Sequence, residues 1–328
     1  MQYPKVRTSR LRASEPLRAL VRQVDLQPHH LIAPLFVHAA PDRQRPIPSM
    51  PGQFQWSVDG AAEFAQQLWA AGVQAVLLFG LPAYKDAQGS ESWQPDGVVQ
   101  RALRRIRDAV ADIVLIADAC FCEYTDHGHC GVLRERRGRL EIDHDATRNN
   151  LARQAASYAA AGADLVAPSG MIDAGVAAVR AGLDEAGFPE VAVMAYAAKY
   201  ASAFYGPFRD AAGGAPSFGD RRGHQMDPAN ADEALREVDL DVQEGADIVL
   251  VKPALAYLDV LHRVKQRFLL PTAAYNVSGE YAMVKAASAH GWIDEHAAVL
   301  EILTSIRRAG ADMIVTYHAL DAANWLKD

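Results

Sequence analysis

The sequence predicts a (β/α)₈ barrel that follows an extended N-terminal arm. Eight short apolar segments alternate with eight helical patterns, and a glycine-containing signature recurs where a helix joins the next strand. No Gly-x-Gly-x-x-Gly sequence follows the first predicted strand, which weakens the alternative of an open dinucleotide-binding sheet. We therefore expect an arm over residues 1–30 and one catalytic barrel over residues 31–328.

The predicted strands are short runs rich in apolar and β-branched residues. Because helices separate them, the strands should be parallel, and a count of eight favours a closed barrel. The strand segments are 31–37, 75–80, 113–119, 165–168, 191–199, 248–252, 272–277 and 313–317. The helical segments are 58–71, 98–110, 145–161, 174–186, 228–244, 256–268, 280–290 and 295–309. Ser57 should cap the first of these helices, and Asp227 with Pro228 should start the fifth.

The helix-to-strand joins resemble one another closely. They read AAGVQAVLL, AAGADLVAP, QEGADIVLVKP and RAGADMIVTY, and each places a glycine directly after the helix. Glycine adopts the left-handed conformation that ends many helices at little cost, so a strand can begin at once. This repeat therefore supports one architecture along the whole chain.

Composition narrows the class of protein. The chain has 328 residues and a net charge of −7, so no global basic field favours nucleic acid. No apolar run approaches the length of a membrane span, and no signal-peptide pattern is present, so we expect a cytoplasmic protein. Pro4, Pro16 and Pro28 interrupt the first 30 residues, in which only residues 17–24 resemble a helix. This arm should pack on another subunit.

A barrel places its functional residues at the carboxyl ends of the strands. Polar residues stand at or just after the ends of six predicted strands: Asp118, Cys120, Ser169, Lys199, Lys252, Ser278 and Tyr317. We expect these side chains to meet at one rim of the barrel.

Two of these residues are lysines that end apolar strands. Lys252 follows DIVLV and precedes Pro253, and Lys199 ends VAVMAYAAK. Burial disfavours the ammonium form and lowers the pKa of a lysine, which makes the amine a nucleophile. A single lysine of this kind is more often one that extends from a strand end to solvent. Two on successive predicted strands favour a catalytic pair.

Three cysteines lie in one loop, which reads DACFCEYTDHGHC. Cys120, Cys122 and Cys130 could hold zinc with a fourth position open, as in a catalytic site. His127 or His129 could instead complete a structural zinc site. The third alternative is that the cysteines are simply buried hydrophobic residues.

Residues 199–228 form a connection too long for an ordinary strand-to-helix loop. The segment contains Arg209, Arg221, Arg222 and Gln225, so residues of about 200–228 could form a lid that binds carboxylates. Scattered arginines on a solvated loop are the simpler interpretation.

Ser278 could cap the helix predicted over residues 280–290 or bind an anion there, and Tyr317 could be a core aromatic residue or a hydroxyl donor.

Four segments resemble the porphobilinogen synthase, or 5-aminolevulinate dehydratase, family: DACFCEYTDHGHCG, AYAAKYASAFYGPFR, VLVKPALAYLD and YNVSGEYAM. The resemblance implies a TIM barrel whose arm wraps a neighbouring subunit, usually in a homo-octamer. It implies condensation of two 5-aminolevulinate molecules to porphobilinogen with loss of two waters, in tetrapyrrole and heme biosynthesis.

The resemblance also implies roles for individual residues. Lys252 and Lys199 would form Schiff bases with the two substrate ketones, and Cys120, Cys122 and Cys130 would bind catalytic zinc. The residues implied to bind substrate are Arg209, Arg221, Gln225, Ser278, Tyr317, Asp118 and, less directly, Ser169. Glu237 stands where some bacterial members bind an allosteric magnesium ion, although it could equally be a solvated helical residue.

Two other functions compete with this one. A class I Schiff-base aldolase acting on phosphorylated sugars would need one lysine, but neither the second lysine nor the three cysteines. A non-catalytic zinc protein would leave both lysines and the arginine-rich segment without a role.

Overall fold

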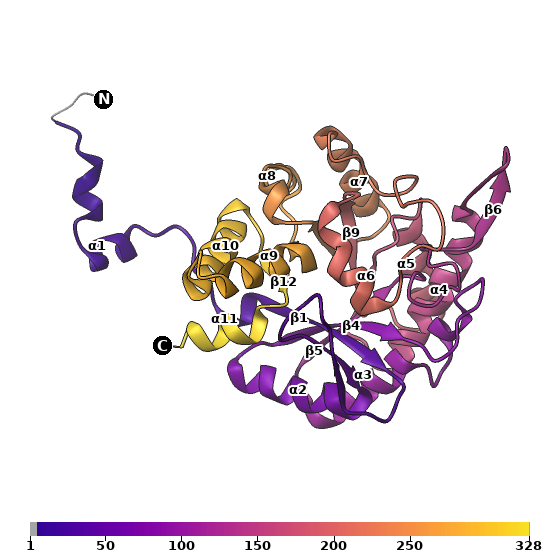
Figure 1. Cartoon of the computed structure of the whole chain (residues 1–328). Helices are drawn as coiled ribbons and strands as arrows, with labels where there is room; N and C mark the ends of the chain where they lie inside the picture. The colour runs from indigo at the N-terminus through magenta and orange to yellow at the C-terminus, as the bar shows by residue number, and fades with distance from the viewer. Residues whose placement is uncertain (1–4, 328) are drawn as a thin grey trace.

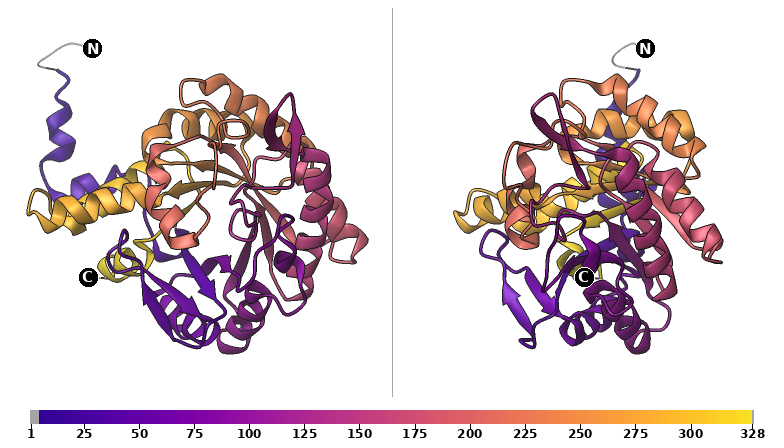
Figure 2. Two further views of the ribbon diagram at one scale, coloured as in Figure 1. Left: turned by 45° about the vertical axis from the view of Figure 1, so that its right-hand side comes forward. Right: turned by 90° about the vertical axis from the view of Figure 1, so that its right-hand side faces the viewer.

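The computed structural model describes residues 5–327 and is a closed barrel of eight parallel strands surrounded by helices (Figure 2). The strand order is β12-β11-β10-β9-β8-β5-β4-β1, and pairing of β12 with β1 closes the ring. The barrel strands are β1 (Leu31–His38), β4 (Ala75–Leu81), β5 (Val114–Ala119), β8 (Leu165–Pro168), β9 (Ala192–Lys199), β10 (Ile248–Lys252), β11 (Thr272–Asn276) and β12 (Met313–Thr316). Each predicted strand agrees to within one residue at either end, so the predicted barrel is confirmed.

The helices around the barrel also follow the prediction closely. They are α2 (Val58–Ala71), α3 (Val98–Ala109), α4 (His144–Ala160), α5 (Gly175–Glu185), α7 (Ala231–Gln243), α8 (Leu258–Phe268), α9 (Ser278–Ala289) and α10 (Glu295–Ala309). The four glycines of the repeated joins, Gly72, Gly162, Gly245 and Gly310, all have positive φ, as the repeat predicts.

One predicted helix start is right and another is wrong. The hydroxyl of Ser57 accepts a hydrogen bond from the Gly60 amide and caps α2. Helix α7, however, begins at Ala231 rather than at Pro228. Asn230 caps it by accepting from the Glu233 amide, while Asp227 caps a turn by accepting from the Ala229 amide. Asn is as good an N-cap as Asp, and it is the one adjacent to the amphipathic segment.

Several elements lie outside the eight-fold repeat. Strands β2 (Gln44–Pro46) and β3 (Phe54–Ser57) extend the sheet beside β1, and β6 (Leu133–Arg136) forms a hairpin with β7 (Arg139–Ile142). The long segment after β9 contains the short helix α6 (Gly206–Ala212), and α11 (Ala319–Trp325) follows β12. The 3-10 helices are η1 (Thr8–Arg12), η2 (Pro28–His30), η3 (Ser90–Trp93), η4 (Ala203–Tyr205) and η5 (Leu255–Tyr257).

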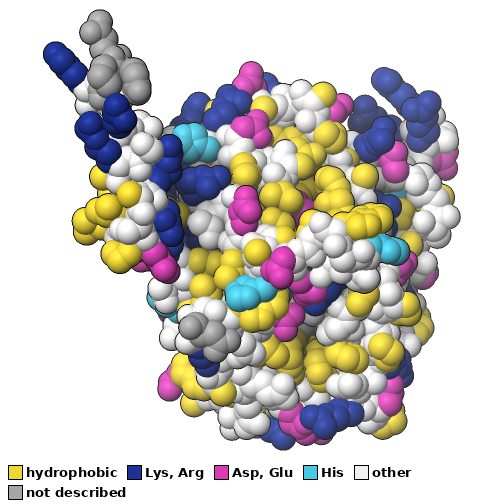
Figure 3. Space-filling view, turned by 60° about the vertical axis from the view of Figure 1, so that its left-hand side comes forward, with side chains coloured by type: hydrophobic (Ala, Val, Ile, Leu, Met, Phe, Trp, Pro, Cys, Tyr) yellow, Lys and Arg dark blue, Asp and Glu magenta, His cyan; other side chains and the backbone are white. Residues whose placement is uncertain are grey.

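The described part of the arm extends away from the barrel (Figure 1). Its helix α1 spans Glu15–Leu20 rather than residues 17–24, because Ser14 caps it and Pro16 occupies its first turn. The arm exposes apolar side chains among its basic ones (Figure 3): Val6, Leu11, Leu20 and Val21. Exposed apolar side chains on an extended segment are typical of a surface that another chain covers.

Two apolar cores pack against the barrel strands and so fix the carboxyl ends of these strands. One fills the barrel interior and includes Phe36, Leu77, Leu250 and Tyr275, while the larger one lies between the strands and the outer helices. Within residues 5–327, no helix combines the length and the apolar character that a bilayer crossing requires.

Candidate active site

The two lysines lie side by side at the carboxyl ends of adjacent strands. Lys199 of β9 and Lys252 of β10 are register partners, and both side chains are at least nine-tenths buried. Two amines thus share one nearly water-free region at the end of the barrel, where the sequence pattern predicted the functional rim.

An irregularity in β9 brings Lys199 to this position. Two steps along β10, from Val249 to Val251, match three steps along β9, from Ala195 to Ala198. The residues Met194 and Tyr196 belong to the interior core, so strict alternation would turn residue 199 to the outside. The extra residue of this bulge reverses the alternation and turns Lys199 inward with Lys252.

Lys252 is surrounded by aromatic rings. Its Nζ lies 4.3 to 5.3 Å from the ring centroids of four residues, Tyr275, Phe208, Tyr205 and Tyr196. Burial, followed by the charge of Lys199, lowers the pKa of Lys252 to about 7. A large fraction of Lys252 is therefore a neutral amine near neutral pH, which is the form that attacks a carbonyl.

Sequence reasoning did not identify these four rings as part of the site. Tyr275 and Tyr196 have a signal that could have been used, because each lies on the interior face of a strand next to a lysine strand. Tyr205 and Phe208 come from the segment after β9, whose path the sequence does not reveal.

Lys199 has a different environment. Its Nζ donates a hydrogen bond to the backbone carbonyl of Ser169, and it lies 5.6 Å from one ring centroid, that of Tyr196. The hydroxyl of Ser169 donates to Oδ2 of Asp118 at 3.0 Å. Burial raises the pKa of Asp118, so a proton can reside on this carboxyl group close to the two amines. The predicted rim residues on β5, β8 and β9 are thus brought together.

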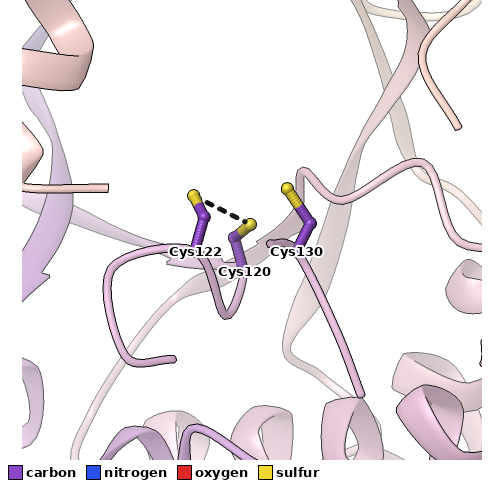
Figure 4. A group of neighbouring side chains, drawn as sticks. All are labelled: Cys120, Cys122 and Cys130. Carbon is purple, nitrogen blue, oxygen red and sulfur yellow. Dashed lines mark hydrogen bonds between the residues drawn. The ribbon is translucent and has the colours of Figure 1, made fainter. Parts of the chain in front are cut away.

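The three cysteines lie close together (Figure 4), and Cys120 also lies beside Asp118. The sulfur atoms of Cys120 and Cys122 are 3.4 Å apart, and all three Sγ atoms lie within 4.8 Å of one another. All three side chains are buried and free of disulfides. The hydrogen bond between the Cys120 and Cys122 thiols is the main reason that the pKa of Cys120 is well below that of an ordinary thiol. Convergent thiols, one of them readily ionised, fit a soft divalent metal such as zinc.

Neither nearby histidine belongs to the thiol cluster found among residues 5–327. Nε2 of His129 lies 3.1 Å from the backbone oxygen of Phe218, and Nδ1 of His127 accepts from the His129 amide. The arrangement therefore favours the three-thiol alternative, with an open fourth position, over a structural site completed by histidine.

Glu123 is a further site residue that the sequence analysis did not single out. Its carboxyl group is buried next to Cys120 and Arg221, and burial raises its pKa to about 7. Its position inside the cysteine loop was the available signal, but the sequence does not tell which loop residues point inward.

The segment after β9 forms a pocket of about 270 Å³ whose lining residues are mostly polar or charged. Arg209, Arg221 and Gln225 line it, and each has a buried side-chain nitrogen without a hydrogen-bond partner among the described residues. Arg221 is held in place because its guanidinium donates to the carbonyls of Gly128 and Gly214. Buried donors without acceptors are costly, so this pocket is suited to a carboxylate. Arg222 also lines the pocket, but it is exposed and pairs with Asp220.

Ser278 and Tyr317 each lie next to a residue whose ring encloses Lys252, namely Phe208 and Tyr275. The Ser278 hydroxyl accepts from the Phe208 amide at 3.0 Å and donates to the Phe204 carbonyl at 3.3 Å, so it joins α9 to the segment around α6. The Tyr317 hydroxyl lies 3.0 Å from that of Tyr275, and its ring packs in the interior core. Tyr317 is therefore a core aromatic residue whose hydroxyl lies beside that of Tyr275, and its role as a hydroxyl donor stays a prediction.

Glu237 lies far along the chain from the thiols and lines a separate small cavity of about 30 Å³. Asp173 and Asp241 line the same cavity. Burial, together with the charges of Glu244 and Glu237, raises the pKa of Asp241 to about 8. The acidic side chains around this cavity are of a type that binds Mg²⁺.

Comparison with known proteins identifies the family. The family model described as Delta-aminolevulinic acid dehydratase matches residues 5–325. A relative of that name from Synechococcus elongatus is 52% identical over 324 residues, covering 99% of both chains. One from Mycobacterium tuberculosis is 53% identical over 327 residues, covering 99% of this chain and 98% of the relative. The crystal structure of the Toxoplasma gondii ME49 enzyme with its reaction product porphobilinogen matches with a TM-score of 0.94 at 43% identity, covering 99% of this chain and 92% of that one. The chain belongs to the delta-aminolevulinic acid dehydratase family.

Proposed function

We infer that this protein is a porphobilinogen synthase, a hydro-lyase that condenses two molecules of 5-aminolevulinate into porphobilinogen and releases two waters. The observation that carries this conclusion is the buried pair of Lys199 and Lys252 at a barrel rim that also holds three thiols. The substrate has a ketone, an amine and a carboxylate, and the rim has groups suited to each.

We propose that Lys252 is the principal Schiff-base residue and that Lys199 is its partner. The neutral amine of Lys252 would attack a substrate ketone, and loss of water would give an iminium that acidifies the adjacent carbon. Ser278 and Tyr317 would hold the carboxylate of one substrate. Arg209, Arg221 and Gln225 would hold that of the other and keep the two molecules in contact, which makes the condensation effectively unimolecular.

Asp118 is positioned to move protons between the reacting groups. Its burial keeps its pKa raised, and Ser169 fixes its orientation by a hydrogen bond. The iminium steps need a group that can accept a proton from carbon and return one to a leaving oxygen. A buried carboxyl group near both amines, with its pKa raised by burial, could do this.

We propose that Cys120, Cys122 and Cys130 hold a catalytic Zn²⁺. When bound, zinc would supply Lewis-acid polarisation of a substrate oxygen or amine, or a bound water of lowered pKa. Treatment with a chelator should abolish activity, and added zinc should restore it together with one metal ion per chain. Full activity in metal-free protein would remove the thiols from the mechanism.

A regulatory Mg²⁺ at Glu237 is a further proposal, supported by the acidic cavity that Glu237 shares with Asp173 and Asp241. Glu237→Gln should reduce any stimulation of activity by magnesium, and an unchanged response would exclude the site.

We also propose a cytoplasmic homo-oligomer, such as an octamer, in which the arm contacts a neighbouring subunit. Deletion of residues 1–30 should lower the molecular mass measured by light scattering.

One assay tests the main proposal. Purified protein incubated with 5-aminolevulinate should form a pyrrole detectable with an aldehyde reagent. A class I aldolase would instead cleave or form phosphorylated sugars, and a non-catalytic zinc protein would do neither. Absence of a pyrrole product in zinc-loaded protein would contradict the proposed function.

A further inference from the structure

Glu280 is a buried acid at the first turn of α9 that belongs to none of the groups described above. Its side chain is about 1% exposed. Burying a carboxylate is costly unless hydrogen bonds compensate for the lost water. Its partners among residues 5–327 are all N–H donors, and these come from two different parts of the rim.

The first part is the loop that follows Lys252. Oε1 of Glu280 accepts a hydrogen bond from the Leu255 amide at 2.9 Å. In the same loop, the Ala254 amide donates to the Tyr275 carbonyl at 2.9 Å. Glu280 thus fixes the chain three residues after Lys252 against the end of β11.

The second part is the turn that presents Ser278. Oε2 of Glu280 accepts from the Val277 amide and from Nδ2 of Asn276, both at 2.9 Å. Val277 immediately precedes Ser278, so the same carboxylate that holds the Lys252 loop also holds the Ser278 backbone.

Asn276 extends this connection to β12. Its Oδ1 accepts from the Thr316 hydroxyl at 2.9 Å, and that hydroxyl accepts from the His318 amide at 3.2 Å. Tyr317 lies between these two residues. Asn276, Thr316 and His318 are all buried, so the chain of hydrogen bonds is shielded from water and is stronger for it.

We propose that Glu280 is a positioning residue that holds Lys252, Ser278 and Tyr317 in register for one substrate molecule. This rests on the proposed roles of those three residues. Glu280 contacts no substrate. It holds the backbone next to Lys252, Ser278 and Tyr317, so that the distances between the amine and the two carboxylate-binding hydroxyls stay fixed. Small displacements of such groups reduce reaction rates strongly, since a shift of about 1 Å can cost about 10²-fold.

Glu280→Gln is the informative substitution because it keeps the shape and changes the hydrogen bonding. An amide has one oxygen and one NH₂ group, so at least one N–H partner would face another donor. The single variant should lower kcat/KM by about 10- to 100-fold and raise KM for 5-aminolevulinate. Borohydride trapping of the substrate on Lys252 should need more substrate for the same yield.

Two further variants separate positioning from folding. Glu301→Gln makes the same change at an exposed position of α10 and should leave all these values unchanged. In Glu280→Gln with Asn276→Asp, the new amide can donate to the new carboxylate, which still accepts from Thr316. The double variant should therefore recover part of the lost kcat/KM.

The outcomes are distinct. If the wild type traps on Lys252 while Glu280→Gln keeps kcat/KM and KM within twofold, this inference is wrong and the proposed function stands. It is also wrong if the activity loss merely equals the fraction of unfolded protein seen by circular dichroism. If the wild type itself does not trap on Lys252, the proposed role of Lys252 fails, and this inference with it.

Discussion

Lys199 and Lys252 are partners across one pair of strands, yet their surroundings differ. Lys252 is enclosed by four aromatic rings, whereas Lys199 has one ring and a backbone carbonyl as a hydrogen-bond acceptor. The rings remove water from the amine of Lys252, and this burial is the main reason that its pKa is lowered. Two lysines of the same burial can therefore have different chemical tasks. These surroundings support the proposal that Lys252 is the principal Schiff-base residue and that Lys199 is its partner.

The largest effect should come from removing the amines one at a time. Lys252→Met should reduce kcat by at least about 10³-fold, because no other group can form the principal Schiff base. Lys199→Met should cost about 10²-fold and still permit borohydride trapping on Lys252. Mass spectrometry of trapped peptides checks both. Trapping confined to Lys199 in the wild type would reverse the assignment.

A second experiment tests the electrostatic part of the comparison. Since the pKa of Lys252 is about 7, its trapping rate should rise as pH increases from 6 to 8 and then level off. The charge of Lys199 lowers this pKa, so Lys199→Met should move the rise to higher pH. Lys265→Met is the matched control, because it removes a lysine of α8 that pairs with Asp312 instead of lying beside Lys252. An unmoved profile in Lys199→Met would mean that the two amines do not interact.

The aromatic enclosure should give a smaller shift of opposite sign. Phe208→Leu keeps an apolar cover over Lys252 but removes a ring face 4.9 Å from its Nζ. A cation–ring contact away from water stabilises the ammonium by about 2 kcal/mol, so the trapping profile should move to lower pH by up to about 1.5 units. A shift to higher pH would indicate that water entry, rather than the ring face, dominates.

The smallest effect is expected at Ser169. Lys199 uses the backbone carbonyl of Ser169, which Ser169→Ala retains, so only the hydrogen bond to Asp118 is lost. One such bond is worth about 0.5–1.5 kcal/mol, which corresponds to a loss of activity of roughly 2- to 15-fold. Steady-state kinetics measures this, and a loss as large as that of Lys199→Met would show that the hydroxyl itself holds Lys199.

The comparison also shows how far sequence reasoning could reach. The alternation of strands and helices, with glycine after each of four helices, was enough to predict the barrel because helix-to-strand joins are local. Lys252 follows from the simple alternation of β10. The inward position of Lys199 depends on the bulge in β9. The residue types of the segment AVMAYAAK do not reveal where a strand contains one extra residue.

The path of the segment after β9 could not be predicted for a related reason. Its length and arginines indicated a carboxylate-binding role, but the insertion of Phe208 and Tyr205 over Lys252 depends on long-range packing. Phe208 packs against Phe36 and Phe79, which lie more than a hundred residues away in the chain. The buried hydrogen bonds of Glu280 could not be predicted, because its sequence position is that of an ordinary glutamate in the first turn of a helix.

The hydroxyl of Ser278 has one hydrogen, and the Phe204 carbonyl already accepts it. A carboxylate can only accept hydrogen bonds, so a substrate held by Ser278 as proposed would have to take that hydrogen from the segment around α6. Substrate and the closed segment thus compete for a single proton donor. By thermodynamic reciprocity, whatever holds the segment closed weakens binding there, and binding loosens the segment. Under that proposal, the affinity for 5-aminolevulinate at Ser278 and the release of the segment around α6 would be one coupled equilibrium.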